Sequence, residues 1–163
     1  PYVLMHSCGD SQSMDRLAVY GDVVADVRDA LRAATDQALA AGVRPSQIIW
    51  DPGLGFAKDT GHNLKLLEGL ETLTGQGFPV LLGPSRKRFI GAVLNEPRPK
   101  ARLWGTAAVV CRAIAAGVAI VRVHDVGAIA QTVRMAEALW PSGSGLRSES
   151  PEPLQREANQ VQP

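Results

Sequence analysis

Four short apolar segments alternate with stretches of helical periodicity, and this alternation constrains the fold more than any other feature of the sequence. The apolar segments are typical of buried strands and lie at residues 2–6, 48–51, 80–82 and 119–124. The helical stretches carry apolar residues every three or four positions and lie at residues 22–41, 63–74, 89–94, 101–116 and 129–140. Strands that alternate with helices build a parallel sheet covered by helices. The sequence therefore predicts an α/β fold in residues 1–140, with about four βα units.

The same alternation decides between two α/β architectures. No GxGxxG sequence follows a predicted strand, so a dinucleotide-binding Rossmann fold is not supported. A (β/α)8 barrel of the TIM type fits the pattern better, although a complete one needs about 250 residues and eight strands. The chain has 163 residues, so it is predicted to form half of a TIM-type barrel.

Composition and charge exclude other classes of protein. The formal net charge is +1 and aromatic residues make up 5% of the chain, so no nucleic-acid-binding or membrane-binding surface is predicted. The longest apolar run, residues 113–121, is too short to span a bilayer. Cys8 and Cys111 form no CxxC pair, which favours reduced thiols, a cytoplasmic location and no zinc site.

The two ends of the chain carry separate predictions. No signal peptide is visible, and the chain opens on an apolar segment without an initiator methionine, which suggests that its true N-terminus has been removed. Residues 141–163 are rich in Ser, Pro, Glu and Gln, so we predict a disordered tail there.

Each predicted strand ends in polar side chains, at the end where barrel enzymes build their active sites. These side chains are His6, Asp51, Ser85, Lys87, Arg122 and His124. Arg122 and His124 are two residues apart, so they share a strand face with Ile120 and are predicted to point inward. An arginine in an apolar strand is costly unless an anion pairs with it. The alternatives are an edge-strand arginine in water, a turn or capping aspartate at position 51, and a surface lysine at position 87.

Three cations follow the third predicted strand, namely Arg86, Lys87 and Arg88. Ser85 is predicted to be the N-cap of the helix that follows, which places the cations in its first turn. Cations at that end oppose the helix dipole, and a bound anion would remove the conflict. The alternative is a solvated, basic helix start.

A glycine-rich turn follows Asp51, in the segment Pro52-Gly53-Leu54-Gly55-Phe56. Its glycines let the backbone approach a flat ligand closely, and Phe56 is placed to stack on that ligand. Together with the basic turn and the Arg-x-His strand, this segment predicts a site for a flat, hydrogen-bonding heterocycle that carries phosphate. Cys8 and His62 are predicted to be loop residues without partners.

Five segments make the pattern specific to one family. They are Leu4-Met5-His6, Asp51-Pro52-Gly53-Leu54-Gly55-Phe56, Gly83-Pro84-Ser85-Arg86-Lys87, Arg102-Leu103-Trp104-Gly105-Thr106 and Arg122-Val123-His124-Asp125-Val126. In this order they resemble the C-terminal half of a bacterial dihydropteroate synthase. The resemblance implies a (β/α)8 barrel, usually a homodimer, that joins 6-hydroxymethyl-7,8-dihydropterin diphosphate to p-aminobenzoate in folate biosynthesis and releases diphosphate. Sulfonamides compete for the aminobenzoate site of this family.

The resemblance also implies how the pterin is held. Asp51 would bind the ring nitrogens of the pterin. Met5, Phe56 and Gly83 would form the walls of the pocket. Asp51 would further stabilise the pterin cation that remains when diphosphate leaves.

The other implied roles concern the second substrate and the leaving group. Lys87 would contact the pterin and cover the aminobenzoate with its aliphatic stem, and Ser85 would meet the aminobenzoate carboxylate. Arg122 and His124 would bind the diphosphate and stabilise the charge that develops on it. Asp51, Lys87 and Arg122 are the residues implied to be catalytic.

The resemblance places Mg²⁺ and the mobile loops in the first half of the barrel, so no metal ligand is implied among the residues of this chain. Two alternatives stay open. One is a methyltetrahydrofolate-binding methyltransferase, which has a similar pterin pocket but no diphosphate to bind. The other is an inactive, truncated half-barrel.

Overall fold

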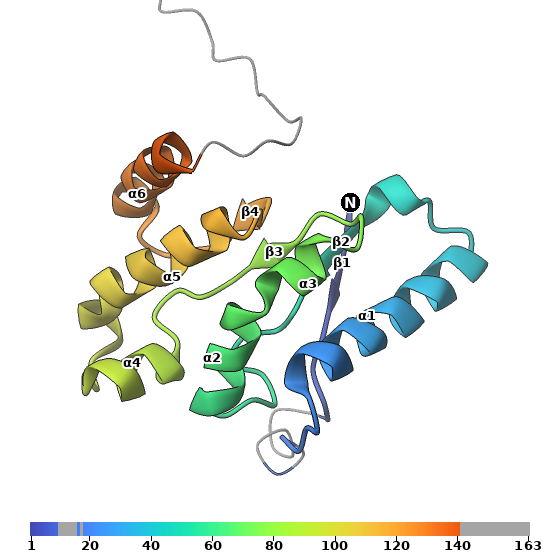
Figure 1. Cartoon of the computed structure of the whole chain (residues 1–163), viewed down its shortest axis with the longest axis horizontal. Coiled ribbons are helices and arrows are strands. Elements are labelled where there is room, and N and C mark those ends of the chain that lie inside the picture. Colours follow the sequence, from blue (N-terminus) through green and yellow to red (C-terminus); the bar gives the residue numbers. More distant parts are fainter. Residues whose placement is uncertain (10–15, 17, 141–163) are drawn as a thin grey trace, which may run out of the picture.

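The computed structural model describes residues 1–9, 16 and 18–140 (Figure 1). Its strands are β1 (Tyr2–Met5), β2 (Ile48–Asp51), β3 (Leu81–Leu82) and β4 (Ile120–Val121). Its α-helices are α1 (Val23–Ala40), α2 (Thr60–Glu68), α3 (Leu70–Thr74), α4 (Arg88–Leu94), α5 (Leu103–Ala115) and α6 (Val126–Leu139). Short 3-10 helices at Pro45–Gln47 and Pro99–Arg102 precede β2 and α5. The predicted α/β alternation is confirmed, and the tail predicted at residues 141–163 lies outside the described residues.

The four strands are parallel and follow one another in chain order. β1 pairs with β2, and β3 pairs with β4. A parallel bridge between Trp50 and Val80 joins the two pairs, and the Trp50 N–H donates to the Pro79 carbonyl at 2.9 Å. Consecutive βα units produce this order, because each crossover returns the chain to the next position in the sheet.

One face of the sheet is packed against helices. Its side chains, together with the helical residues that cover them, form the main core: Val27, Leu31, Ile48, Trp50, Leu66, Leu70, Leu73, Val80 and Leu82. Trp50 fixes α1 to the sheet, because its indole Nε1 donates to Thr35 Oγ1 at 2.8 Å. The Trp50 ring also stacks on Phe78, with ring centroids 5.3 Å apart.

The other face of the sheet is open within the described residues. The register places Val3 beside Ile49 and Leu81 beside Ile120. Val3 is 42% exposed and Ile120 is 38% exposed. In a closed barrel such side chains fill the interior. The described part of the chain is therefore a sheet with one covered face and one uncovered apolar face.

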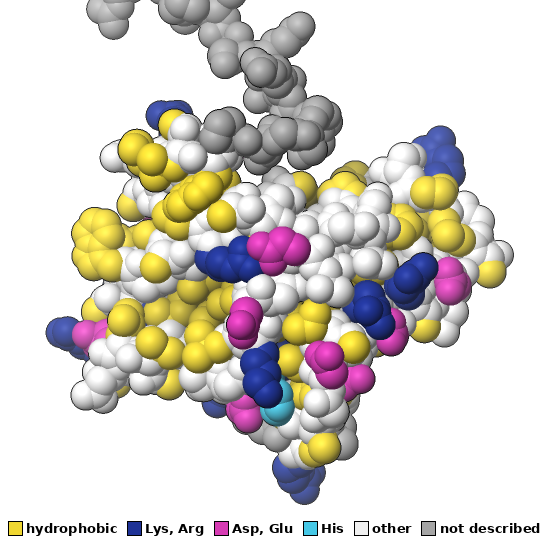
Figure 2. All heavy atoms as spheres, in the orientation of Figure 1, with side chains coloured by type: hydrophobic (Ala, Val, Ile, Leu, Met, Phe, Trp, Pro, Cys, Tyr) yellow, Lys and Arg dark blue, Asp and Glu magenta, His cyan; other side chains and the backbone are white. Residues whose placement is uncertain are grey.

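The outer surface in Figure 2 mixes charges of both signs, with basic side chains beside acidic ones. Hydrophobic side chains gather over α4, α5 and α6 on the same face (Figure 2). Trp104, which is 78% exposed, and Met135, which is 59% exposed, belong to α5 and α6. No helix among residues 1–9 and 18–140 is long and apolar enough to cross a membrane.

The prediction of a single helix at residues 63–74 is wrong. α2 begins earlier, at Thr60, because Asp59 Oδ1 accepts from the His62 N–H at 2.7 Å and caps the helix. The chain then breaks at Gly69 before α3. A Cβ at Gly69 would lie 2.8 Å from Cγ2 of Val24, so close packing of α1 requires glycine at the break.

The prediction that Ser85 caps the helix after β3 is also wrong. The N-cap of α4 is Lys87, whose side chain makes no capping hydrogen bond. The chain first turns over residues 84–87, with the Lys87 N–H donating to the Pro84 carbonyl at 3.2 Å and Arg86 at φ 60°. Only Arg88 lies in the first helical turn, so the predicted conflict of three cations with the helix dipole is not present.

We expect the chain to self-associate through the open face of the sheet, because uncovered apolar strands are prone to association. The double change Val3→Lys and Ile120→Lys should lower the mass measured by sedimentation velocity toward that of a monomer. Leu64→Lys alters a residue on α2 that is 45% exposed and should leave association unchanged. A monodisperse wild-type monomer would contradict the prediction.

Candidate functional site

Side chains predicted at the strand ends meet on the open side of the sheet. Asp51 ends β2, and its register partner Met5 ends β1. Gly83 and Arg122 follow β3 and β4, and a Cβ at position 83 would lie 3.0 Å from Nη2 of Arg122. Nη2 of Arg122 is 3.9 Å from Oδ2 of Asp51. Asp51 and Arg122 thus lie close together, as the prediction that strand-end side chains meet at one end of the sheet requires.

Asp51 is a buried carboxylate, 2% exposed, with a fixed orientation. Its Oδ1 accepts from the Gly53 N–H at 2.8 Å. Burial raises the pKa of Asp51, while the Gly53 N–H and the cations of Arg122, Lys87 and Lys58 act in the opposite direction. Asp51 is therefore a turn aspartate through one oxygen, and its other oxygen faces a cation.

The glycine turn after Asp51 brings the backbone close to other parts of the chain. Gly53 has φ 68°, and a Cβ there would lie 1.9 Å from the carbonyl oxygen of His6. Gly55 has φ 74°, and a Cβ there would lie 3.1 Å from Cδ of Lys87. A larger residue at position 53 would push the turn away from β1, and one at position 55 would press on the Lys87 side chain. Either would also be strained at a positive φ. Close approach to a flat ligand, the predicted reason for these glycines, stays a prediction.

Lys87 is half-buried rather than a free surface lysine. Its Nζ lies over the Phe56 ring, 4.2 Å from the centroid, at a distance typical of a cation–π contact. Burial lowers the pKa of Lys87, the Arg122 cation lowers it further, and Asp51 raises it. The turn after β2 and the turn after β3 thus meet through Phe56 and Lys87.

A cavity of about 310 Å³ opens between the ends of β3 and β4 and is lined by Gly83, Ser85, Lys87, Arg122, Val123 and His124. Ser85 Oγ accepts from the His124 backbone N–H at 3.1 Å and lies 2.8 Å from His124 Nδ1. Ser85 therefore orients His124, and its predicted contact with an aminobenzoate carboxylate stays a prediction.

Arg122 is not a buried cation. β4 ends at Val121, earlier than predicted, and the Arg122 side chain is 63% exposed. Burial alone therefore does not require an anion beside this guanidinium. The case for an anion rests on the cavity, where Arg122 and Lys87 lie together.

Two further arginines support the site, and sequence reasoning did not assign them this role. Arg86 donates to the carboxylate of Asp125 through Nε at 3.0 Å and through Nη2. The buried guanidinium of Arg102 donates to backbone carbonyls on both sides of α4, those of Arg86, Lys87, Glu96 and Pro97. The only sequence signal for Arg102 was its place in a segment shared with the family.

Sequence reasoning also missed a buried group around Lys58. Its Nζ lies 2.9 Å from His6 Nδ1 and donates to the carbonyls of Gly53 and Phe56 at 3.2 and 3.0 Å. Burial lowers the pKa of Lys58 to about 8. Burial and the Lys58 cation lower the pKa of His6 to about 4. No periodicity marks a lysine of this kind, since it lies in a loop.

The prediction that Cys8 and His62 lack partners is wrong. Cys8 Sγ lies 3.8 Å from Tyr20 Oη and 4.0 Å from His6 Nε2. The His62 ring meets the Tyr20 ring edge-on, with centroids 5.0 Å apart. Tyr20, whose Oη also donates to the Ala57 carbonyl at 2.8 Å, joins the loop of Cys8 to His62, which lies on α2 and not in a loop as predicted.

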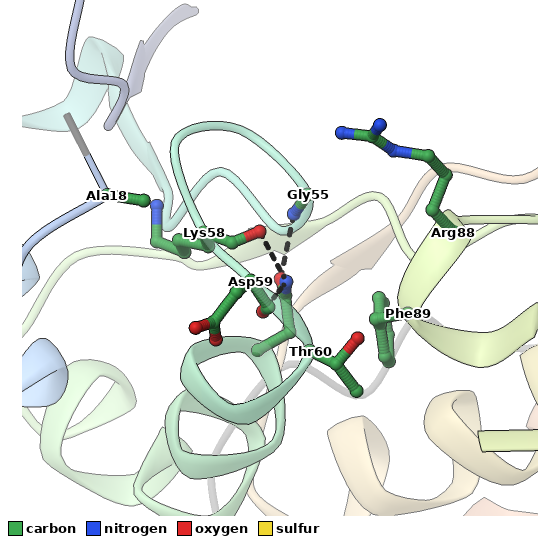
Figure 3. Close-up of a pocket in the computed structure, with 8 residues that line it drawn as sticks. Ala18, Gly55, Lys58, Asp59, Thr60, Arg88 and Phe89 are labelled. Carbon is green, nitrogen blue, oxygen red and sulfur yellow. Dashed lines mark hydrogen bonds between the residues drawn. The ribbon is translucent and has the colours of Figure 1, made fainter. Parts of the chain in front are cut away.

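A second cavity, of about 270 Å³, lies beside the glycine turn and is lined by Ala18, Gly55, Lys58, Asp59, Thr60, Asn63, Arg88 and Phe89 (Figure 3). Within it, Asn63 Oδ1 accepts from the Gly55 N–H at 2.8 Å. Asn63 Nδ2 donates to the carbonyls of Lys58 and Asp59. The Lys58 side chain turns away from Arg88 and Phe89 (Figure 3).

The described residues do not fit the Mg²⁺ that the family implies. Within residues 1–9, 16 and 18–140, no three side chains of His, Cys, Asp or Glu come together to hold a metal ion. Asp51, the carboxylate of the site, has one oxygen committed to the Gly53 N–H.

Comparison with known proteins supports the resemblance to dihydropteroate synthases. The family described as pterin binding enzyme matches residues 1–124. A dihydropteroate synthase of Synechocystis sp. is 53% identical over 140 residues, which are 86% of this chain and 48% of the relative. The chain thus spans about half the length of the curated relatives it matches.

Solved structures give the same result. The dihydropteroate synthase of Thermus thermophilus, solved with 4-aminobenzoate and with 6HMPPP, has a TM-score of 0.80 at 42% identity in both complexes. The matches cover 85% of this chain and 56% or 55% of those chains. The Yersinia pestis enzyme in a sulfonamide complex has a TM-score of 0.82 at 34% identity, over 85% of this chain and 50% of that one. With its fold, its strand-end geometry and a family match over most of its length, this chain belongs to the pterin-binding enzyme family.

Proposed function

We propose that this chain forms the C-terminal half of a dihydropteroate synthase barrel. The proposed reaction joins 6-hydroxymethyl-7,8-dihydropterin diphosphate to p-aminobenzoate and releases diphosphate. The observation that carries the proposal is the buried carboxylate of Asp51, 3.9 Å from the guanidinium of Arg122, next to the cavity that Lys87 and His124 line. The relatives solved with 4-aminobenzoate, 6HMPPP and a sulfonamide support the same substrate class.

A second half is part of the proposal. The chain spans about half of its relatives, and one face of its sheet is open within the described residues. We call the assembly of this chain with four further βα units in front of it the complete barrel. The resemblance places Mg²⁺ ligands in that other half, a homodimer as the assembly and the cytoplasm as the location. The exposed apolar side chains of α5 and α6, such as Trp104 and Met135, support an interface.

In the proposed reaction the bond between the pterin methylene carbon and the diphosphate oxygen breaks, and the electron pair leaves with the diphosphate. The aminobenzoate nitrogen bonds to the methylene carbon and loses a proton. Arg122 and Lys87 line one cavity, so both cations are placed to stabilise the negative charge that grows on the leaving group. His124, oriented by Ser85, adds a ring nitrogen to the same cavity.

Asp51 acts on the other side of the broken bond. Its Oδ1 is held by the Gly53 N–H, so Oδ2 faces the site in one orientation. A fixed carboxylate accepts from the N–H groups of a pterin ring and stabilises the positive charge that develops as diphosphate leaves. The Phe56 ring, over which Nζ of Lys87 lies 4.2 Å from the centroid, and the Lys87 stem supply an apolar wall for a flat ring.

Diphosphate release tests the proposed function. The complete barrel should release diphosphate only when the pterin diphosphate and p-aminobenzoate are both present, and the chain alone should release little or none. Diphosphate should also raise the melting temperature of the complete barrel, as ligand linkage requires. Binding of methyltetrahydrofolate with no response to diphosphate would favour the methyltransferase alternative. A complete barrel without turnover would favour the inactive half-barrel.

Arg122→Ala should weaken binding of the diphosphate-bearing pterin more than binding of the same pterin without diphosphate. Loss of a charge-assisted hydrogen bond to phosphate costs about 1.5–3 kcal/mol. Calorimetry on the complete barrel measures both affinities. Arg134→Ala, which removes an exposed cation on α6, is the matched control and should change neither. Equal losses for the two pterins would contradict a phosphate role for Arg122.

Asp51→Asn should weaken binding of the pterin with or without diphosphate, because the amide presents a donor where the ring N–H needs an acceptor. Wild-type affinity should fall as the pH drops through the pKa of Asp51, which burial raises above its ordinary value, since the neutral acid is a weaker acceptor. In Asp51→Asn, the affinity should not show this fall at low pH. Fluorescence titration with the pterin at several pH values checks both expectations, and unchanged affinity at neutral pH would remove Asp51 from the site.

A further inference from the structure

Lys58 lies beside the proposed site but outside its cavity, and all of its hydrogen-bonding capacity is used inside the protein. The side chain belongs to a residue that is 6% exposed. An ammonium has three donors, and Lys58 meets three acceptors. These are His6 Nδ1 at 2.9 Å and the carbonyl oxygens of Gly53 and Phe56 at 3.2 and 3.0 Å.

The two carbonyls bracket the turn that orients the site. The Gly53 N–H holds Oδ1 of Asp51 at 2.8 Å, and the Phe56 ring carries Nζ of Lys87 at 4.2 Å. Two glycines at positive φ, Gly53 and Gly55, shape this turn. Glycine has more backbone freedom to lose on folding than any other residue. The turn has one internal hydrogen bond, from the Phe56 N–H to the Gly53 carbonyl at 3.0 Å, and Lys58 adds a hydrogen bond from outside at each end.

His6 connects these ties to the sheet. Its backbone N–H donates to the Asp51 carbonyl at 2.9 Å, continuing the pairing of β1 with β2. Since His6 Nδ1 accepts from an ammonium, its ring proton lies on Nε2, toward Cys8 Sγ at 4.0 Å. The backbone of Lys58 is held as well, because its carbonyl accepts from Asn63 Nδ2 at 3.2 Å (Figure 3).

We propose that Lys58 is a positioning residue for pterin binding: its ammonium holds the turn of residues 52–56 against the end of β1 and so keeps the Asp51 carboxylate and the Phe56 ring in the orientation that the ligand needs. The inference rests on the proposed pterin role of Asp51 and deepens it. Lys58 touches no ligand-facing atom in the cavity of Arg122 and His124, so it acts through the turn.

The charges around Lys58 make its effect on Asp51 measurable. The groups that face it are His6 and Cys8 after β1, Tyr20 before α1 with its ring 5.9 Å from Nζ, and Asp51 on β2. Asp26 of α1 acts on the neighbouring His6 and Tyr20. The Lys58 cation opposes the burial that raises the pKa of Asp51. Removal of the cation, with release of the Gly53 N–H, should therefore raise the pKa of Asp51 further.

The test compares three variants of the complete barrel. Lys58→Met removes the charge and the hydrogen bonds, Lys58→Arg keeps a charge and donors, and Lys65→Met makes the same change at an exposed lysine of α2. In Lys58→Met, the Kd for 6-hydroxymethyl-7,8-dihydropterin should rise about 10-fold or more, and amide exchange at Gly55 and Phe56 should speed up by a similar factor. Lys58→Arg should restore affinity toward wild type, and Lys65→Met should match wild type.

Two readouts separate positioning from general stability. The ¹³Cγ shift of Asp51 followed against pH should have a higher midpoint in Lys58→Met and a wild-type midpoint in Lys58→Arg. In the wild-type protein, which needs no variant, ¹⁵N spectra should show a slowly exchanging ammonium at Lys58 below the pKa of about 8. A Lys58 ammonium that exchanges as fast as that of Lys65 would contradict the proposed positioning role of Lys58.

The remaining outcomes are also decisive. If folded Lys58→Met shows unchanged amide exchange in the turn and an unchanged pH midpoint of the Asp51 shift, the positioning role is overturned. If amide exchange in the turn is faster but pterin affinity is unchanged, Lys58 holds the turn without affecting ligand binding, and the proposal is overturned. If wild type binds no pterin, the proposed function fails, while amide exchange and the Asp51 titration still decide whether Lys58 holds the turn.

Discussion

The alternation of side chains along four short parallel strands is the constraint on which the rest of the structure depends. Residues that point one way, such as Trp50 and Leu82, are buried against helices, while their neighbours point to the open face. A strand repeats its facing every second residue, so the last inward position of each strand is determined once the core residues are chosen. Asp51 occupies such a position, Arg122 follows β4 in the same alternation, and the two side chains meet for that reason.

A buried carboxylate is costly, and the surroundings of Asp51 reduce that cost in a way that suits a ligand. Burial favours its neutral form, whereas one backbone N–H and three cations favour the ionised form. The Arg122 guanidinium does not form a hydrogen bond with Asp51, since it is 3.9 Å away, beyond ordinary hydrogen-bond distance. A ring N–H group that enters the site finds a carboxyl oxygen whose orientation has already been fixed, so little reorganisation is needed.

The turns at the site are held by side chains that lie outside the cavity of Arg122 and His124. Arg102 binds four backbone carbonyls around α4, Asn63 binds the glycine turn, and Lys58 joins that turn to His6. Each is buried and fully paired, because an unpaired polar group would be expensive there. Loops that carry function thus gain rigidity from polar residues brought in from other segments of the chain.

The sequence by itself determined the α/β alternation, the parallel strands and the inward direction of Arg122, because hydrophobic periodicity indicates which face of a strand or helix is buried. Five short segments also identified the family. The sequence did not determine that Gly69 splits a helix, that Ser85 bonds His124 instead of capping α4, or that Lys58 is buried beside His6. Those features depend on contacts between segments far apart in the chain, such as Val24 against Gly69 and Ser85 against His124. Local propensity depends only on neighbouring residues and does not predict such contacts, so only the tertiary structure decided them.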